Sequence, residues 1–308
     1  MPSRSRPPID RTLLWIARGA WALLPLGAGP ALGHALAEAS RPVQLTASLG
    51  LWAAWGVGLV ASLVPTTVSL TTWRLLAPGP LAVVAVALVH RSDGGAGALA
   101  VAVAHALVVA VLVFTGEVGE IFVQGSAYGA EHRFPLRVPG PLLVGPLPIG
   151  WALAAAGLMA GPLLVAAERW WQGALVTLSG AAWAGVFAPR CHRLSRRFVV
   201  FVPAGFVIHD HLVLADTALF SADTVHGMRL APVGTEAADA TGAALGRALE
   251  VHVEKGMLVM AGTLKKPGGT ALHVRSLLVS PTRPGRVLAQ AATRHWTMAH
   301  DAVAPPST

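Results

Sequence analysis

The sequence predicts an α-helical transmembrane bundle of about six spans, followed by a C-terminal β-rich cytoplasmic domain. The mean hydropathy of the 308 residues is +0.60 and only 12% of them are charged, against about 25% in soluble proteins. No lysine occurs between Arg11 and Arg190, where long apolar runs dominate. After the basic segment 190–197 the helical pattern gives way to alternation of apolar and polar residues. We interpret this change as the exit of the chain from a membrane.

The predicted spans follow from length. A hydrocarbon core of about 30 Å requires about 20 helical residues. Six stretches reach this length: 12–36, 44–64, 68–90, 95–115, 145–167 and 171–188. The third includes Arg74 and the Pro78-Gly79-Pro80 break, so five spans are the alternative. The resulting domains are an N-terminal segment (1–11), a transmembrane domain (12–188) with a long connecting loop (115–140), a β-rich domain with a C-terminal helix (189–300) and a disordered tail (301–308).

Arginines near the span ends predict the orientation, because basic residues collect in cytoplasmic loops. Three precede the first span and four follow the last: Arg4, Arg6 and Arg11, then Arg190, Arg193, Arg196 and Arg197. Both termini should therefore be cytoplasmic in a multi-pass protein of a bacterial plasma membrane, and the number of spans should be even. The second group are candidate membrane-surface residues, attracted to anionic headgroups by about 1 kcal/mol per charge. Determining the topology is the simpler role for them.

The composition limits the partners and cofactors that this protein can be expected to bind. The net charge is +8, yet no basic stripe interleaved with aromatic residues appears, so nucleic acid is not an expected partner. The single cysteine, Cys191, allows no internal disulfide and no zinc site of the CxxC type. The sequence contains no phosphate-binding GxxxxGK[ST], HExxH or GxSxG motif. We therefore expect no cofactor and no metal, and lean against an enzyme.

Two ionisable residues of the predicted spans are candidate functional residues, because such groups are costly in hydrocarbon. His105 lies near the middle of the fourth span, beyond reach of an interface. It either bonds a backbone carbonyl across the bundle or lines a passage for protons or a solute. Arg74 lies in the first turns of the third span, where it can extend to the surface or line the same passage.

The predicted loop 115–140 holds further candidates. These are Glu117, Glu120, His132, Arg133 and Arg137. We expect a turn at 125–129, followed by an extended, proline-stiffened strand at 133–141 that lies on the membrane surface. Arg133 and Arg137 could then contact an anionic headgroup or a partner protein. The two glutamates alone are a weak signature for a hard cation.

Alternating residues predict a strand meander in the C-terminal domain. Two strands surround a Pro-Ala-Gly turn within 198–210, and further strands are expected at 211–214, 217–220, 224–230, 248–254, 257–261 and 272–279, before a short amphipathic helix at 285–296. This order suggests a pleckstrin-homology-like (PH-like) barrel, with a general α+β domain as the alternative. His209 and His211 share a strand face, but two imidazoles do not make a metal site.

The segments Arg197-Phe198-Val199-Val200-Phe201-Val202-Pro203-Ala204-Gly205 and Leu278-Val279-Ser280-Pro281-Thr282-Arg283-Pro284-Gly285 resemble those of uncharacterised polytopic integral membrane proteins of actinobacteria. The resemblance covers most of the chain and implies no activity. We expect an accessory or scaffolding membrane protein, whose partners are the lipid bilayer, anionic headgroups and another membrane or cytoplasmic protein. A small-solute channel or transporter is the alternative from another class. A lipid-modifying enzyme, using Glu117, Glu120, His132 and Arg133, is the third.

Overall fold

The computed structural model describes residues 11–89, 96–263, 266–294 and 296. The predicted tail, and all of the predicted N-terminal segment except Arg11, lie outside these residues. The chain divides into two compact units. We call them the helical unit (residues 1–126 and 148–192) and the β unit (residues 127–147 and 193–308). Each unit is therefore built from two separate stretches of the chain.

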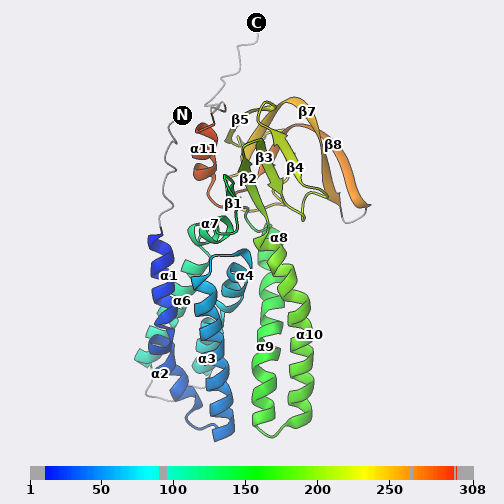
Figure 1. Ribbon diagram of the computed structural model, residues 1–308. Helices are drawn as coiled ribbons and strands as arrows, with labels where there is room; N and C mark the ends of the chain where they lie inside the picture. The colour runs from blue at the N-terminus through cyan, green and yellow to red at the C-terminus, as the bar shows by residue number, and fades with distance from the viewer. Residues whose placement is uncertain (1–10, 90–95, 264–265, 295, 297–308) are drawn as a thin grey trace. The chain divides into compact units, whose positions relative to one another are not determined.

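The helical unit is formed by helices (Figure 1). They are α1 (Thr12–Ala22), α2 (Leu24–Leu36), α3 (Arg41–Leu63), α4 (Thr67–Leu76), α5 (Gly79–Val89), α6 (Ala96–Val113), α7 (Gly116–Gln124), α9 (Pro146–Ala166) and α10 (Trp170–Ser195). Among the described residues, four helical stretches are long and apolar enough to cross a membrane: Arg41–Leu63, Thr67–Val89, Ala96–Val113 and Gly140–Ala166. The predicted third span, in spite of its proline break, is one of the four.

The first predicted span is two helices rather than one, because Pro25 has no N–H to donate to the carbonyl of Trp21 four residues earlier. The indole Nε1 of Trp55 donates to that carbonyl instead, at 3.0 Å. Trp21 returns the bond, since its own Nε1 donates to the carbonyl of Trp55 at 2.9 Å. This reciprocal pair fastens the α1–α2 break to α3. The last predicted span is the continuous helix α10, which is less apolar than the four stretches above.

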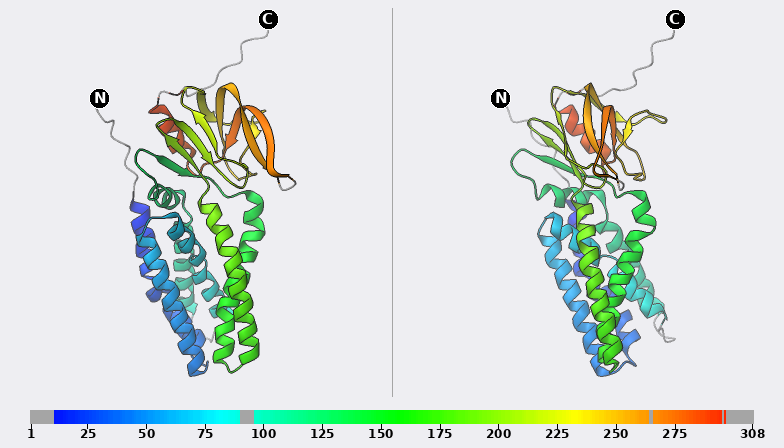
Figure 2. Two further views of the ribbon diagram at one scale, coloured as in Figure 1. Left: turned by 45° about the vertical axis from the view of Figure 1, so that its right-hand side comes forward. Right: turned by 90° about the vertical axis from the view of Figure 1, so that its right-hand side faces the viewer.

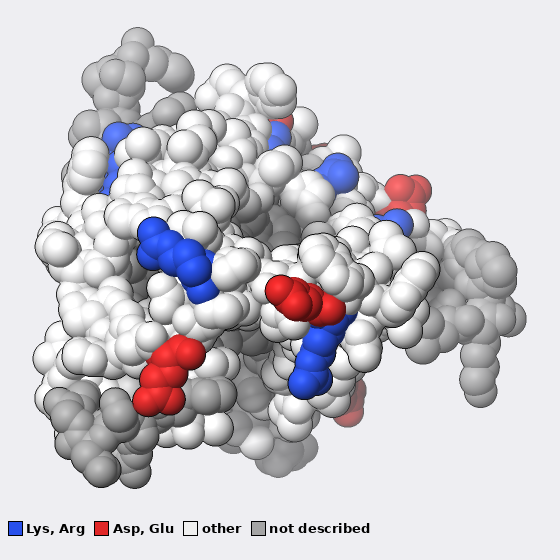
Figure 3. All heavy atoms as spheres, turned by 90° about the horizontal axis from the view of Figure 1, so that it is seen from below, with Lys and Arg blue, Asp and Glu red and all other residues white. Residues whose placement is uncertain are grey.

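Many large apolar side chains of the helical unit are exposed, although others, such as Trp21 and Leu70, are buried. Ser62 and Thr71 are buried, whereas Leu49 and Val89 are 70% and 81% exposed. Large apolar side chains on the outside of helices are typical of surfaces that contact another apolar medium. Figure 3, which views the molecule from below, shows charged side chains scattered among uncharged atoms of the described residues. Together with the four long apolar helices, these exposed apolar side chains suggest a membrane protein.

Helices α9 and α10 form a hairpin whose two backbones approach closely. A Cβ on Gly157 would lie 2.5 Å from the Cα of Gly180, so neither position has room for a side chain. Close crossing at small residues is a common way for helices to associate in membranes, where apolar burial gives no driving force. The Nε1 of Trp183 also donates to the carbonyl of Gly150 at 2.8 Å. The two helices run side by side in Figures 1 and 2.

The β unit contains two four-stranded sheets. The first has the order β1-β2-β3-β4 and is antiparallel throughout, and the second has the order β5-β7-β8-β6, in which β6 runs parallel to β8. The strands are β1 (His132–Pro135), β2 (Phe198–Val202), β3 (Gly205–His209), β4 (Ala218–Ser221), β5 (Val225–Leu230), β6 (Ala238–Asp239), β7 (Leu249–Thr263) and β8 (Lys266–Val279). The short helix α8 (Gly140–Val144) and the helix α11 (Pro284–Ala292) complete the unit. Figure 2 shows the long β7–β8 hairpin extending from the second sheet.

One core joins the two sheets and α11. Alternate residues of the first sheet point inward, among them Phe134, Val199 and Phe206, and meet Leu249 and Val287 from the second sheet and the helix. The strand expectations for β2, β3, β5 and β8 agree with the structure. Residues 211–213 form a turn rather than a strand, and the strands expected at 248–254 and 257–261 are a single one, β7.

The stretch expected to be one long loop, 115–140, differs most from the structure. Its first part is helix α7, and its later part is strand β1, which pairs with β2 in the register Pro135↔Phe198. The strand expected on the membrane surface is therefore the edge strand of a sheet. Sequence patterns missed this because the four-residue strand pairs with a partner more than 60 residues away, and local periodicity does not report such pairing.

Candidate functional site

The best-organised polar site of the β unit is a buried ion pair between Arg197 and Asp210. The guanidinium donates from Nε to Oδ1 at 2.7 Å and from Nη2 to Oδ2 at 2.6 Å, and each side chain is 1% exposed. The remaining Nη1 donates to the carbonyl of Arg137 at 2.6 Å, and the N–H of Leu212 donates to Oδ1 at 3.1 Å. A buried ion pair is tolerated when such additional hydrogen bonds satisfy both partners.

This pair sits where three segments of the β unit meet. Arg197 precedes β2, Asp210 follows β3, and Arg137 follows β1. The N–H of Leu136 donates to the carbonyl of Arg197 at 3.0 Å, and the N–H of Arg137 donates to the carbonyl of Ser280 at 2.8 Å. We call the Arg197–Asp210 pair with the Arg137 carbonyl the clasp. It fastens the segment after β1 to the rest of the β unit.

The expected role of Arg197 at the membrane surface is therefore wrong, because its guanidinium is buried and fully engaged. The other basic residues of the exit segment differ from it. Arg193 and Arg196 are exposed. Arg190 is also exposed and donates from Nη1 to the carbonyl of Val186 at 2.7 Å, within its own helix. The contact of Arg190, Arg193 and Arg196 with lipid headgroups stays a prediction.

The predicted anion contacts of the segment 132–137 hold structural partners. Arg133 donates from Nε and Nη2 to Oε2 of Glu131, at 3.0 and 2.7 Å, and its guanidinium lies 5.1 Å from the ring centre of Phe198. Arg137 donates to the carbonyl of Arg247 at 2.8 Å. His132 is half-buried and begins β1. Only Arg133 lies beside the cationic residues described next.

A continuous row of cationic and aromatic side chains crosses β1, β2 and β3. The ring of His209 stacks on Phe198 with centres 4.9 Å apart, and His211 meets His209 edge-on at 4.3 Å. We call Arg133, Phe198, His209 and His211 the cationic row. Desolvation lowers the pKa of His209, as do, in smaller measure, the charges of His211, Arg196 and Arg133.

The pKa of His211 is lowered in the same way. Desolvation is again the first cause, and the charges of Arg196 and then Arg193 and Arg197 add to it, against the opposing effect of Asp210. Positive charge therefore surrounds both imidazoles. The described residues contain no group of three or more His, Cys, Asp or Glu side chains that could hold a metal ion.

The two candidates of the predicted spans, His105 and Arg74, contact different backbone carbonyls in the helical unit. His105 on α6 bonds through Nε2 to the carbonyl of Ala20 at 2.8 Å, and its ring fills the space beside Gly27. Arg74 on α4 donates from Nε to the carbonyl of Val113, at the end of α6, at 3.5 Å, and its guanidinium lies 5.7 Å from the ring centre of Phe114. Both side chains form hydrogen bonds with backbone carbonyls near a helix end or break.

Glu117 and Glu120 lie on helix α7 rather than in a loop. Glu120 is 2% exposed, and Glu117 is in the first turn, where a carboxylate interacts favourably with the helix dipole. Both have interaction partners within the protein.

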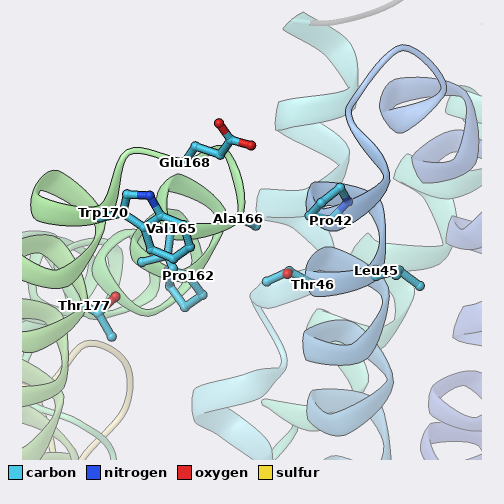
Figure 4. A pocket seen from close by; sticks show the side chains of 9 residues that line it. All are labelled: Pro42, Leu45, Thr46, Pro162, Val165, Ala166, Glu168, Trp170 and Thr177. Carbon is cyan, nitrogen blue, oxygen red and sulfur yellow. The ribbon is translucent and has the colours of Figure 1, made fainter.

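A hollow of about 680 Å³ opens between α3 and the α9–α10 turn (Figure 4). Its lining is mostly apolar and includes Leu45, Val165 and Trp170, with Glu168 at its edge. Glu168 is in the left-handed region at φ 63°, the position that closes α9 before the turn. The hollow contains none of the sequence-predicted site residues.

Comparison with known proteins gives no relative: no protein-family model, no curated protein and no solved structure matches the chain. The sequence pattern of His209 and His211 indicates only a possible pair of metal ligands. The signal it missed is that His209 lies beside the ring of Phe198, one residue after Arg197, which sequence periodicity alone does not reveal.

Proposed function

We propose that this chain is a six-span bacterial plasma-membrane protein with both termini in the cytoplasm, and that it acts as an accessory or scaffolding protein through its β unit. The exposed apolar helix surfaces and the four long apolar helices support residence in a membrane. The broken α1–α2 segment and α10 would supply the other two spans.

The observation that carries the proposal is the pairing of β1 with β2. The two strands belong to one folded unit, so both must lie on the same side of a membrane. The chain leaves this unit near residue 147 and returns near residue 193. It must therefore cross the membrane an even number of times in between, and the α9–α10 hairpin provides two crossings. Four crossings before β1 then place the N-terminus on the same side.

The β unit supports a PH-like barrel as its architecture. Two four-stranded sheets enclose one core, and a helix follows the last strand. This chain would depart from a contiguous barrel in one respect, because its first strand precedes the α9–α10 hairpin. Such an interrupted module would be tied to the bundle by three chain connections, which suits a scaffold that must hold a defined position.

The scaffolding role is supported by where the polar candidates make their contacts. His105 and Arg74 bond to carbonyls of neighbouring helices, which favours packing roles over the lining of a shared passage. The exposed Arg193 and Arg196, close to the cationic row, offer the β unit a surface for an anionic partner. The rival channel or transporter predicts instead that solute flux in proteoliposomes depends on His105.

Labelling with a membrane-impermeant thiol reagent tests the topology. In a Cys191→Ser background, Tyr128→Cys and Val233→Cys place thiols at two highly exposed positions of the β unit, and Arg169→Cys places one in the α9–α10 turn. In intact cells we expect labelling at position 169 only, and labelling at all three positions in lysed cells. Opposite behaviour of positions 128 and 233 would refute the one-sided β unit.

Purification of the full-length protein in mild detergent tests the scaffolding role. Arg193→Glu with Arg196→Glu should remove a stoichiometric protein or anionic lipid that accompanies the wild type, whereas the exposed Arg275→Glu should not. Deletion of residues 191–308 is a poorer test, because it removes the partners of β1. Solute flux abolished by His105→Leu would favour the channel instead.

A further inference from the structure

The outer face of the first sheet presents an unusual surface. Because successive side chains of a strand point to opposite faces, the inward-facing Phe134, Val199 and Ile208 leave Arg133, Phe198 and His209 on the opposite face, where Phe198 is 9% exposed and the other two are half-buried. Phe198 and His209 are directly paired in register, and Arg133 lies two residues along β1 from Pro135, the partner of Phe198. The cationic row is thus built from three adjacent strands.

The charges around this row do not balance. Two neighbouring carboxylates are already engaged, Asp210 by Arg197 inside the clasp and Glu131 by Arg133. The charged and titratable groups that act on the two imidazoles are Arg133, Arg193, Arg196, Arg197 and Asp210, together with the imidazoles themselves. Because Arg133 and Arg197 are each paired with a carboxylate, the uncompensated positive charge comes from Arg193 and Arg196. An anion bound beside His209 and His211 would offset this repulsion.

We propose that His209 and His211 of the cationic row, together with the neighbouring exposed Arg196, bind the phosphate group of an anionic phospholipid. This inference rests on the proposed function, because it requires the β unit to face the anionic leaflet. Arg193 lies in the last turn of α10 and Arg196 directly follows it, so both leave the proposed last span near headgroup depth. Leu212, next to His211, is 42% exposed and can contact the acyl boundary.

The imidazoles make this binding depend on pH. An anion favours their charged forms, so binding and protonation reinforce each other. Near neutral pH both rings are mainly neutral, and Arg196 and Arg193 provide the attraction. As the pH falls through the lowered pKa values, each ring gains a charge, and each charge near an anionic headgroup strengthens binding about fivefold.

The test uses the full-length protein in a neutral detergent, mixed with equal amounts of short-chain phosphatidylglycerol and phosphatidylcholine. Retained lipids are counted by native mass spectrometry at pH 7.5 and pH 5.5, at constant ionic strength. We expect a preference for phosphatidylglycerol that is larger at the lower pH. Arg196→Gln should reduce the preference about fivefold at both pH values, whereas the matched control Arg275→Gln should leave it unchanged.

A second variant separates the imidazoles from the arginines. His209→Gln with His211→Gln should keep the preference at pH 7.5 and lose its increase at pH 5.5, whereas the exposed His226→Gln should keep both. Equal retention of the two lipids by the wild type, or an unchanged preference in Arg196→Gln, would overturn the site. Displacement by inorganic phosphate at the concentration that suffices for phosphatidylglycerol would identify a free-anion site and overturn the lipid assignment.

The detergent experiment does not depend on orientation, so the two proposals fail separately. If the protein prefers phosphatidylglycerol but thiols in the β unit are labelled from outside the cell, the proposed topology is wrong and the phosphate site still holds. If the thiols are labelled as the topology predicts but the protein shows no lipid preference, only the phosphate site is wrong. Each variant is first compared with the wild type by thermal unfolding, so that a loss of binding is not a loss of fold.

Discussion

Arg197 and Asp210 form a bidentate ion pair with both side chains withdrawn from solvent, and the same guanidinium holds the carbonyl of Arg137. Asp210→Asn should destabilise the β unit by about 3–5 kcal/mol, because it leaves a buried guanidinium without its counter-charge. The measurement is the unfolding midpoint of the full-length protein in detergent. Trypsin cleavage after Arg133 and Arg137 should accelerate in parallel, since the clasp fastens that segment.

A matched control and a double variant sharpen this prediction. Asp223→Asn, at an exposed position, should unfold like the wild type. Replacing both partners, Arg197→Met with Asp210→Leu, should recover most of the lost stability, because apolar groups of similar volume do not leave a charge unpaired. If Asp210→Asn unfolds at the wild-type midpoint, the clasp is not what fastens the segment after β1.

The contact of His105 with Gly27 predicts a size limit at that glycine. A Cβ on Gly27 would lie 2.0 Å from the Nδ1 of His105, so Gly27→Ala should cost about 1–3 kcal/mol of stability through overpacking. The loss should be largely relieved in Gly27→Ala with His105→Ala. Gly29→Ala, where nothing lies within 4 Å of the added Cβ, is the control. Additive effects of Gly27→Ala and His105→Ala would contradict the contact.

The α9–α10 hairpin predicts a second steric limit. Gly180→Val should force the helices apart at Gly157, because the added carbons have no space beside the facing backbone. We expect lower thermal stability, and accelerated labelling of a thiol placed in the turn by Arg169→Cys. Gly185→Val, on the same helix but with open space around it, should change neither. An unaltered midpoint in Gly180→Val would mean that the two helices do not cross closely.

The histidines of the cationic row predict a loss of stability in acid. Their folded pKa values are lowered, first by desolvation and then by neighbouring positive charges, while in the unfolded chain they titrate near about 6.5. The unfolded chain then binds more protons below that pH. Their contribution to stability is complete above about pH 6.5 and declines as the pH falls toward the lowered folded pKa values.

Thermal unfolding at pH 7.5 and pH 5.5 measures this effect. His209→Gln with His211→Gln should flatten the pH dependence, and the exposed His226→Gln should preserve it. Phosphatidylglycerol should raise the midpoint more at pH 5.5 than at pH 7.5 if the phosphate of that lipid binds the row, because a ligand that prefers the folded, protonated site stabilises it. A steeper pH dependence in the double variant would contradict the account.

Particular residues show how far sequence patterns reach. The alternation of Leu249, Val251 and Val253 with polar residues predicts a half-buried strand, and these three are buried in β7. The same pattern places Glu250 outside, yet it is 2% exposed, because Arg229 and His252 hold its carboxylate at 3.1 and 3.4 Å. Periodicity reports which face a residue occupies, but not which partners from other strands cover it.

The sequence by itself determined the long apolar helices, the change of character near Arg190 and most strands of the β unit, because these depend on local composition and period. Only the tertiary structure decided that residues 132–135 join β2, that Arg197 is buried against Asp210, and that Arg133, Phe198, His209 and His211 form one row. These relationships join segments that are distant in the chain, and their energy depends on which side chains meet.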